Sequence, residues 1–159
     1  TDIMRVSELS GLSEERCKEL IDYLGTHTDV VPSNDDDELE AIDFALASLA
    51  IEVAVTRHAG HLEQYYSPMG ISYMQIGKDL TAVKTVIVTG GALIHTKRTA
   101  QIASHALFNP LDAFSLKPKE AQVLVDRKYI LAAMGILSTE YPQTALRIMK
   151  KELVKDGNH

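Results

Sequence analysis

The chain has 159 residues, 45% of them hydrophobic and 24% charged, which is enough apolar material for one hydrophobic core. Its 16 basic and 22 acidic residues give a formal net charge of −6, so it would repel a phosphate backbone and we expect no nucleic-acid partner. Its apolar stretches are too short to cross a bilayer and Thr1 does not begin a signal peptide, so we expect a cytoplasmic protein without membrane contact. Because the chain does not begin with methionine, we interpret it as a piece of a longer protein.

The first predicted element is a short amphipathic helix. Ser13 is a favoured N-cap, and the apolar residues after it recur at helical spacing. The one cysteine, Cys17, falls on the apolar side of this helix and cannot form an internal disulfide. We therefore predict that Cys17 fills the core as a small hydrophobic residue.

A long, alanine-rich helix of five or six turns is predicted from Leu39. The acidic residues 35–38 before it have the composition of a metal cluster, but acids in a first turn also oppose the helix dipole, and we favour that interpretation. The helix is predicted to end in the sequence RHAGH, with Gly60 in the left-handed conformation. His58 and His61 have a possible ligand spacing but no third partner, so we assign no metal ligand.

Strand composition recurs in the second half of the chain. The segment YYSPMG is predicted to be an exposed turn, and a strand, a glycine turn and a helix are predicted in succession around Gly90 and Gly91. A last helix is predicted to begin with Pro142 at its first position and to bury Ala145, Leu146, Met149 and Leu153. The predicted strands are ISYMQIG (71–77), VIVT (86–89) and QVLVD (122–126).

Two βα units therefore follow one another, VIVTGG with its helix and QVLVD with the helix in KYILAAMGIL. Short connections of this type require parallel strands, so the sequence predicts an α/β fold that is helix-rich and has a short, mainly parallel sheet. Gly90, Gly91 and Asp126 fall at the carboxyl ends of the strands, where such sheets bind ligands. The sequence around Gly77 lacks the spacing of a Walker A loop.

Longer blocks of the sequence carry a family resemblance. VIVTGGALIH, followed by a helix, a strand and YILAAMGIL, is similar to part of the second lobe of the actin, sugar kinase and heat-shock chaperone superfamily of ATPases. More closely, RHAG, PMG, GKDLTAVKTVIVTGGALIH, SLKPKEAQVLVDRKYILAAMGILS and YPQTALRIMKKEL resemble the glutamate mutase L family, also called methylaspartate mutase accessory proteins. This resemblance runs from about Asp43 to Val154. It implies a small helical segment or insertion at 1–34 and the carboxy-terminal part of an actin-like ATPase lobe at 35–159.

The resemblance also implies a nucleotide site. Thr89, Gly90, Gly91 and Ala92 would lie against the adenosine and its α-phosphate, with the glycines allowing close approach of the backbone. His95 and Lys97 follow the turn and would reach a phosphate or the ribose, although solvated loop residues look the same in sequence. Asp126 would contact the ligand or orient the turn, but N-capping of the next helix explains it as well.

The same resemblance implies an accessory protein that reactivates an adenosylcobalamin-dependent mutase. ATP or ADP with magnesium would bind to the full-length protein, and cobalamin would belong only to the partner enzyme. The DxGT-type phosphate loop of the superfamily is absent, so we assign no catalytic residue and expect a missing amino-terminal lobe of the same chain. Expected partners are mutase subunits, that lobe and a second copy.

Two other functions stay open at this point. The chain could be a non-catalytic module that docks the mutase through the long helix from Leu39 or through the basic last helix. It could also be an unrelated dinucleotide enzyme, although the sequence GGA lacks the spacing of a dinucleotide-binding loop.

Overall fold

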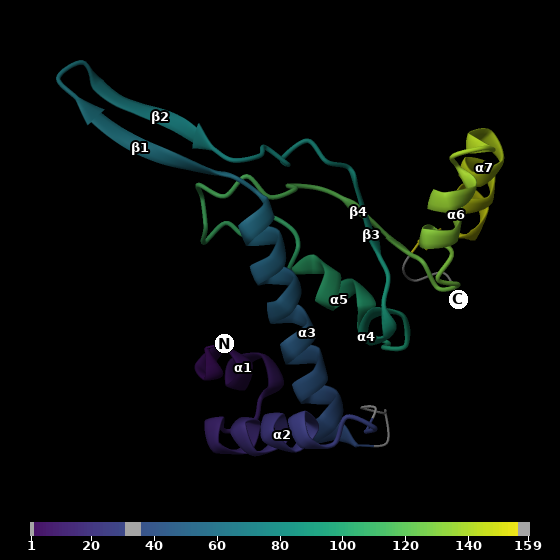
Figure 1. Ribbon diagram of the computed structural model, residues 1–159. Coiled ribbons are helices and arrows are strands. Elements are labelled where there is room, and N and C mark those ends of the chain that lie inside the picture. Colours follow the sequence, from purple (N-terminus) through teal and green to yellow (C-terminus); the bar gives the residue numbers. More distant parts are fainter. Residues whose placement is uncertain (1, 31–35, 156–159) are drawn as a thin grey trace.

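A computed structural model describes residues 2–30 and 36–155 (Figure 1). The long helix α3 runs through the middle of the molecule, and the other elements are arranged around it. In chain order, the elements of the described residues are α1 (Ile3–Ser10), α2 (Glu14–Thr26), α3 (Asp37–His58), β1 (His61–Ser67), β2 (Gly70–Ile76), β3 (Thr85–Val88), α4 (Gly91–Ile94), α5 (Thr99–Ser104), β4 (Gln122–Val125), α6 (Leu131–Leu137), α7 (Pro142–Glu152) and β5 (Val154–Lys155).

Helix α3 confirms the predicted long helix and the role of the acids before it. The Asp36 carboxylate accepts hydrogen bonds from the amides of Glu38 and Leu39, so it caps the helix. Acidic residues occupy the first turn and Arg57 and His58 the last, which matches the helix dipole at both ends. Asp35, which belongs to the same acidic run, lies outside the described residues.

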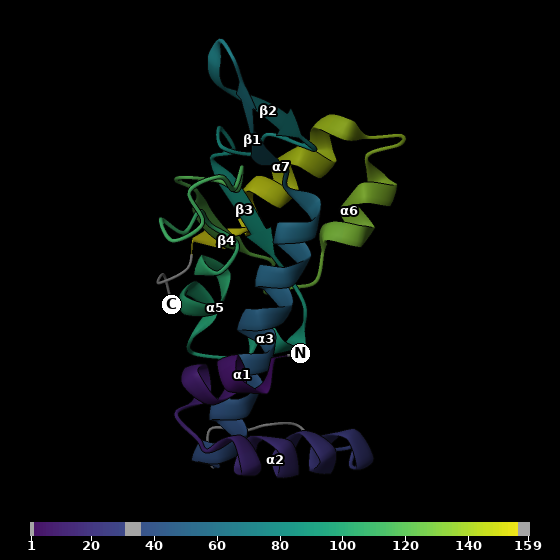
Figure 2. The same ribbon diagram turned by 90° about the vertical axis from the view of Figure 1, so that its left-hand side faces the viewer.

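Helices α1 and α2 pack against α3, α1 along its middle and α2 nearer its amino-terminal end (Figure 2). Ser13 caps α2 by accepting a hydrogen bond from the Arg16 amide, as predicted. Cys17 is fully buried, which confirms its predicted place in the core. The buried apolar residues of this first cluster are Val6, Cys17, Leu20, Ile42, Ala45 and Leu49.

A small sheet forms the second layer, and α5 lies between it and α3 (Figure 1). Strands β3 and β4 are parallel, as the two βα units predicted, but β5 pairs with β4 in the antiparallel direction. The α/β fold is thus confirmed, whereas the expected mainly parallel sheet is wrong, because the chain returns after α7 as an antiparallel strand. A second cluster of Val88, Ile94, Ala103 and Val125 packs here, separate from the first.

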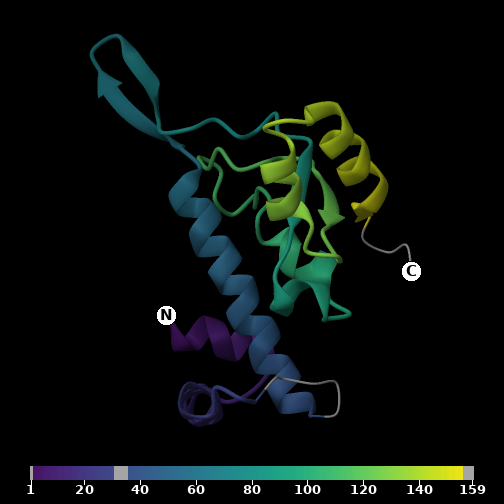
Figure 3. The same ribbon diagram turned by 45° about the vertical axis from the view of Figure 1, so that its right-hand side comes forward.

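Strands β1 and β2 form an antiparallel hairpin that projects beyond the carboxyl end of α3 (Figure 3). The predicted strand at 71–77 is confirmed by β2, but β1 was not predicted, because its sequence HLEQYYS lacks β-branched residues. The expected turn YYSPMG is correct only for its second half. Tyr65 and Tyr66 belong to β1, and the strands join at Ser67 and Gly70.

Gly60 is required by packing and not by its backbone angle. It lacks the positive φ that was predicted for the end of α3, and Ala59 after the helix is extended. A Cβ built on Gly60 would overlap the Ile76 carbonyl oxygen and lie 2.8 Å from the Lys78 nitrogen. The Gly60 amide donates to the Lys78 carbonyl, so this glycine lets two chain segments meet at the base of the hairpin.

Helices α6 and α7 pair with each other at the edge of the molecule (Figure 3). Pro142 occupies the start of α7, as predicted. Ala145 is buried, but Leu146 is 43% exposed, so its predicted place inside the core is wrong. No residue of α6 is buried, although its sequence contains the small residues Ala132, Ala133 and Gly135.

A charged contact joins the two layers across α3. The Arg5 guanidinium donates to both Glu52 carboxylate oxygens at 2.7 and 2.9 Å, and His105 Nδ1 lies 3.4 Å from Glu52 Oε2. Hydrogen bonds from Arg5 and then His105 hold the pKa of Glu52 below its ordinary value of 4.5, although partial burial opposes them. Glu52 therefore ties α1 and the end of α5 to the same turn of α3.

None of the helices within residues 2–30 and 36–155 combines the length and the apolar character that a membrane span needs.

Replacement of Gly60 by alanine should destabilise the protein by roughly 1–3 kcal/mol, because the added Cβ meets backbone atoms that cannot rotate away. Gly135→Ala is the matched control. Its Cβ would enter open space within α6, so it should stabilise the protein slightly. Urea denaturation measures both. Equal stability of the two variants would contradict the close approach at Gly60.

Glu52→Gln should lower the free energy of unfolding by about 1 kcal/mol at neutral pH, a modest value because the Arg5 side chain is 43% exposed and solvent screens the pair. The folded-state pKa is lowered, so this contribution is complete above pH 4.5 and disappears as pH falls through the folded pKa. Denaturation at several pH values measures the difference. Glu140→Gln, which removes a carboxylate at an exposed position, is the matched control, and an equal loss of stability in both variants would contradict the contact at Glu52.

Candidate functional site

The carboxyl ends of β3 and β4 bring together residues that lie far apart in the sequence. Val88 and Val125 are partners in the parallel register, so Thr89 and Asp126 follow side by side. The Thr89 hydroxyl donates to Asp126 Oδ2 at 3.4 Å. The glycine turn and Asp126 thus meet at one edge of the sheet, as the sequence predicted.

The backbone conformation explains the first glycine of this turn, Gly90, but not the second, Gly91. Gly90 has φ +102° and ψ 150°, a conformation that only glycine adopts readily. The chain itself therefore requires a glycine at position 90, with or without a ligand.

Nothing in the described chain requires a glycine at position 91. Gly91 has no positive φ, and a Cβ there would meet only Tyr129 Oη at 3.7 Å, an ordinary contact. The residue is exposed and begins α4. The N–H groups of Gly91 and Ala92 donate to no acceptor among the described residues, as expected for the first turn of a helix. The amides of Gly91 and Ala92 are therefore free to donate, and no side chain at position 91 covers them.

Asp126 is built into the turn that follows β4. Its side chain is buried, and its carboxylate accepts hydrogen bonds from the amides of Ile130 at 3.0 Å and Leu131 at 3.1 Å. These bonds orient the turn before α6, whose N-cap is Ile130, so Asp126 holds the turn and is not the N-cap that the sequence favoured. The predicted ligand contact is not tested by this geometry and stays a prediction.

Tyr129 belongs to this edge and was not predicted. It has φ +53°, which is unusual for a bulky residue, and its hydroxyl is the atom nearest to the Cβ position of Gly91. The side chain is 52% exposed. No sequence pattern marks a tyrosine that will take a left-handed conformation, so sequence reasoning could not have found it.

The other predicted contacts lie at the far end of α4. His95 and Lys97 are both exposed, and the His95 amide caps α4 by donating to the Gly91 carbonyl. Their ligand roles stay predictions. The nearby Arg98 is already engaged, because its guanidinium lies 3.3 Å from the centre of the Phe44 ring and it donates to Gln101.

The arrangement suits a ligand with oxygen atoms of two kinds. The open amides of Gly91 and Ala92 can donate to an anionic oxygen such as that of a phosphate. The Thr89 hydroxyl and the Asp126 carboxylate can bind a hydroxyl group of a sugar. The described residues contain no group of three metal-ligating side chains.

The fold and the residues at the sheet edge define the class of protein. It is an α/β unit that has a glycine turn at the carboxyl end of a parallel strand pair, and its sequence lacks a Walker A loop. The family model described as MutL protein matches residues 2–153, and the chain belongs to this family, the glutamate mutase L family that the sequence resembles.

A curated relative supports the same family. Protein MutL of Clostridium tetanomorphum is 45% identical over 133 residues, which cover 84% of this chain and 28% of that protein. The chain therefore spans little more than a quarter of the length of this relative. No solved structure matches the chain.

The two glycines should respond differently to alanine. Gly90→Ala should lower the stability by about 1 kcal/mol or more, because alanine is strained at φ +102°. Gly91→Ala should leave the stability unchanged or raise it slightly, because its Cβ meets no obstacle. Thermal or urea denaturation of both variants measures the difference. A large loss in Gly91→Ala would show that the fold needs this glycine.

Proposed function

We propose that this chain is the nucleotide-binding part of an ATPase-like accessory protein that reactivates an adenosylcobalamin-dependent mutase of the glutamate mutase type. The observation that carries the proposal is Gly91. Within the described residues nothing requires a glycine there, it is exposed at the carboxyl edge of a parallel strand pair, and its amide and that of Ala92 have no acceptor among those residues. A ligand that approaches the backbone closely would explain why position 91 is a glycine, because any side chain there would occupy the space of the ligand.

The ligand is ATP or ADP. Its α-phosphate would accept hydrogen bonds from the amides of Gly91 and Ala92, and its ribose hydroxyls would bind beside Thr89 and Asp126. At the far end of α4, Lys97 would add positive charge and His95 a ring nitrogen for hydrogen bonding when the phosphates extend toward them. Because Asp126 is negative and buried, it suits the sugar better than the phosphates.

The chain supplies one side of a cleft. Phosphoryl transfer needs a metal ion and positioning groups on both sides of the phosphates, and the described residues show neither a metal cluster nor a second phosphate loop. The relative from Clostridium tetanomorphum is more than three times as long as the matched region. The remaining groups would come from an amino-terminal lobe with an actin-like fold, and hydrolysis would need both lobes.

Membership of the glutamate mutase L family supports the choice of partner. The partner would be the mutase, and cobalamin would stay with that enzyme.

A docking module is the second candidate, and the β1–β2 hairpin favours it. Tyr66 is 77% exposed, Met69 99%, Ile71 56% and Tyr73 56%, on a projecting element with few charges. Exposed apolar side chains grouped in this way mark interaction surfaces. The two functions are compatible, because the hairpin and the glycine turn lie at different places in the molecule (Figure 1).

Gly91→Val should weaken the binding of magnesium-ADP at least about tenfold, because its side chain occupies the space that the ligand needs. Isothermal titration calorimetry of the full-length protein measures the affinity. Gly25→Val in α2 is the matched control, since its Cβ also enters open space but lies far along the chain from the turn. Equal affinities of the two variants would contradict the nucleotide site.

The docking module is tested separately. Co-purification with mutase subunits should be lost in Tyr66→Ser with Tyr73→Ser if the hairpin is the contact, whereas nucleotide affinity should not change. Retention of the mutase by this double variant would exclude the hairpin as its docking surface.

A further inference from the structure

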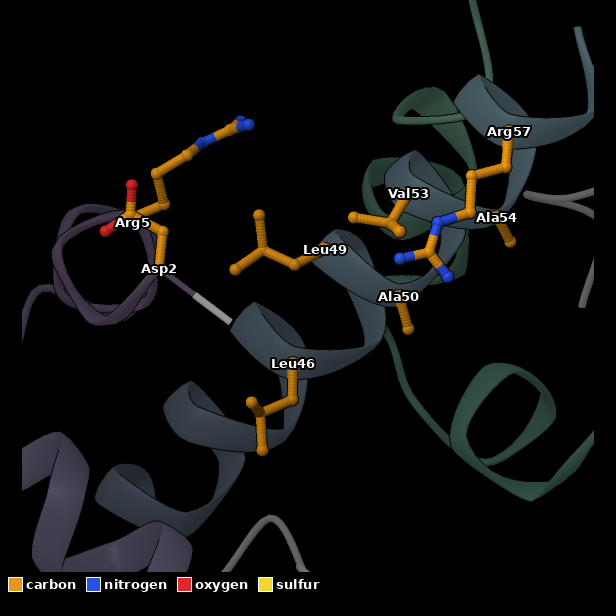
Figure 4. Close-up of a pocket in the computed structure, with 8 residues that line it drawn as sticks. All are labelled: Asp2, Arg5, Leu46, Leu49, Ala50, Val53, Ala54 and Arg57. Carbon is orange, nitrogen blue, oxygen red and sulfur yellow. The ribbon is translucent and has the colours of Figure 1, made fainter.

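A groove of about 600 Å³ runs along the exposed side of α3 (Figure 4). Asp2, the N-cap of α1, and Arg5 of α1 line one wall. The floor consists of residues of α3 at helical spacing, which are Leu46, Leu49, Ala50, Val53, Ala54 and Arg57. Spacings of three and four residues are those of a helix face that packs against another helix.

The floor of the groove is apolar except for Arg57 at one end. Val53 is 45% exposed, and the alanines at positions 50 and 54 are also exposed. Small residues let two helix backbones approach closely, and an exposed valine between them would gain buried area from a partner. The opposite side of α3 is already covered by α5.

Opposite charges stand at the two ends of this face. Asp43 and Arg57 each lie seven residues from Ala50, almost two helical turns, so both fall on the same face as Ala50. Neither side chain has a hydrogen-bond or ion-pair partner among residues 2–30 and 36–155. Partial burial raises the pKa of the Asp43 carboxyl, as expected for a carboxylate without a cation beside it.

We propose that a second copy of this chain docks into the groove through its own α3, with the two helices antiparallel and centred on Ala50. In this register Arg57 of each copy faces Asp43 of the other, and Ala54 faces Leu46. The contact is isologous, so the same pair forms twice.

The charge pattern selects the second copy and its direction. Reversing the helix exchanges its acidic and basic ends, so the face is complementary to itself only in the antiparallel arrangement. A parallel pair would place Asp43 against Asp43 and Arg57 against Arg57. The net charge of −6 on each copy opposes association, so the dimer is expected to form reversibly and to depend on concentration.

Engineered cysteines test the register. Ala50→Cys should form an intermolecular disulfide under mild oxidation, because residue 50 lies opposite its own counterpart. Ala54→Cys is the matched control. Its counterpart would lie eight residues away along the helix, about 12 Å, which is too far for a disulfide. Cys17 is fully buried, so the parent protein should not crosslink.

Charge reversal tests the ion pairs by an independent route. Arg57→Asp and Asp43→Arg should each weaken the dimer about tenfold in sedimentation equilibrium, and the combined variant should restore it. Circular dichroism confirms that each variant is folded.

Three results would overturn the proposal. They are a parent protein that stays monomeric at every concentration, equal crosslinking of Ala50→Cys and Ala54→Cys, and a dimer that does not respond to charge reversal at positions 43 and 57. The last would place any dimer contact on another surface, such as the hairpin.

Discussion

The contact between Arg5 and Glu52 holds the two halves of the molecule on one helix. The buried apolar residues form two separate clusters, one between α1, α2 and α3 and the other between the sheet, α4 and α5. Polar and aromatic contacts add to the packing of α5 on α3: Glu52 binds Arg5 and His105, and Arg98 lies over Phe44. These directional contacts help to fix the position of α5 relative to α3.

This constraint also sets what each surface can do. The parallel register of β3 and β4 holds their carboxyl ends side by side, and the exposed residues Thr89 and Gly91 follow β3. The positive φ of Gly90 explains why that residue is a glycine. Contacts within the described residues do not explain the glycine at position 91, so we attribute it to a bound ligand. On the other side, α3 keeps one apolar face uncovered because α1 reaches only its edge.

The sequence predicted what is encoded locally. Ser13 caps a helix and the βα units give a parallel pair, because each depends on neighbouring residues. What it could not predict depends on distant contacts. Gly60 is set by the approach of residues 76–78, β1 by its pairing with β2, and Tyr129 by a strained turn beside Gly91. The sequence thus predicted that the glycine turn and Asp126 lie at one sheet edge, but the distinction between the two glycines required the structure.

The most direct test of the nucleotide site is a titration of magnesium-ADP into the isotope-labelled protein, followed by the backbone amide signals of residues 89–92 and 126. Saturable shifts at Gly91 and Ala92, with smaller ones at Asp126 and none in α1 or α2, are the predicted result. Signals at 91 and 92 that do not move at millimolar nucleotide, in a protein that remains folded, would contradict the account.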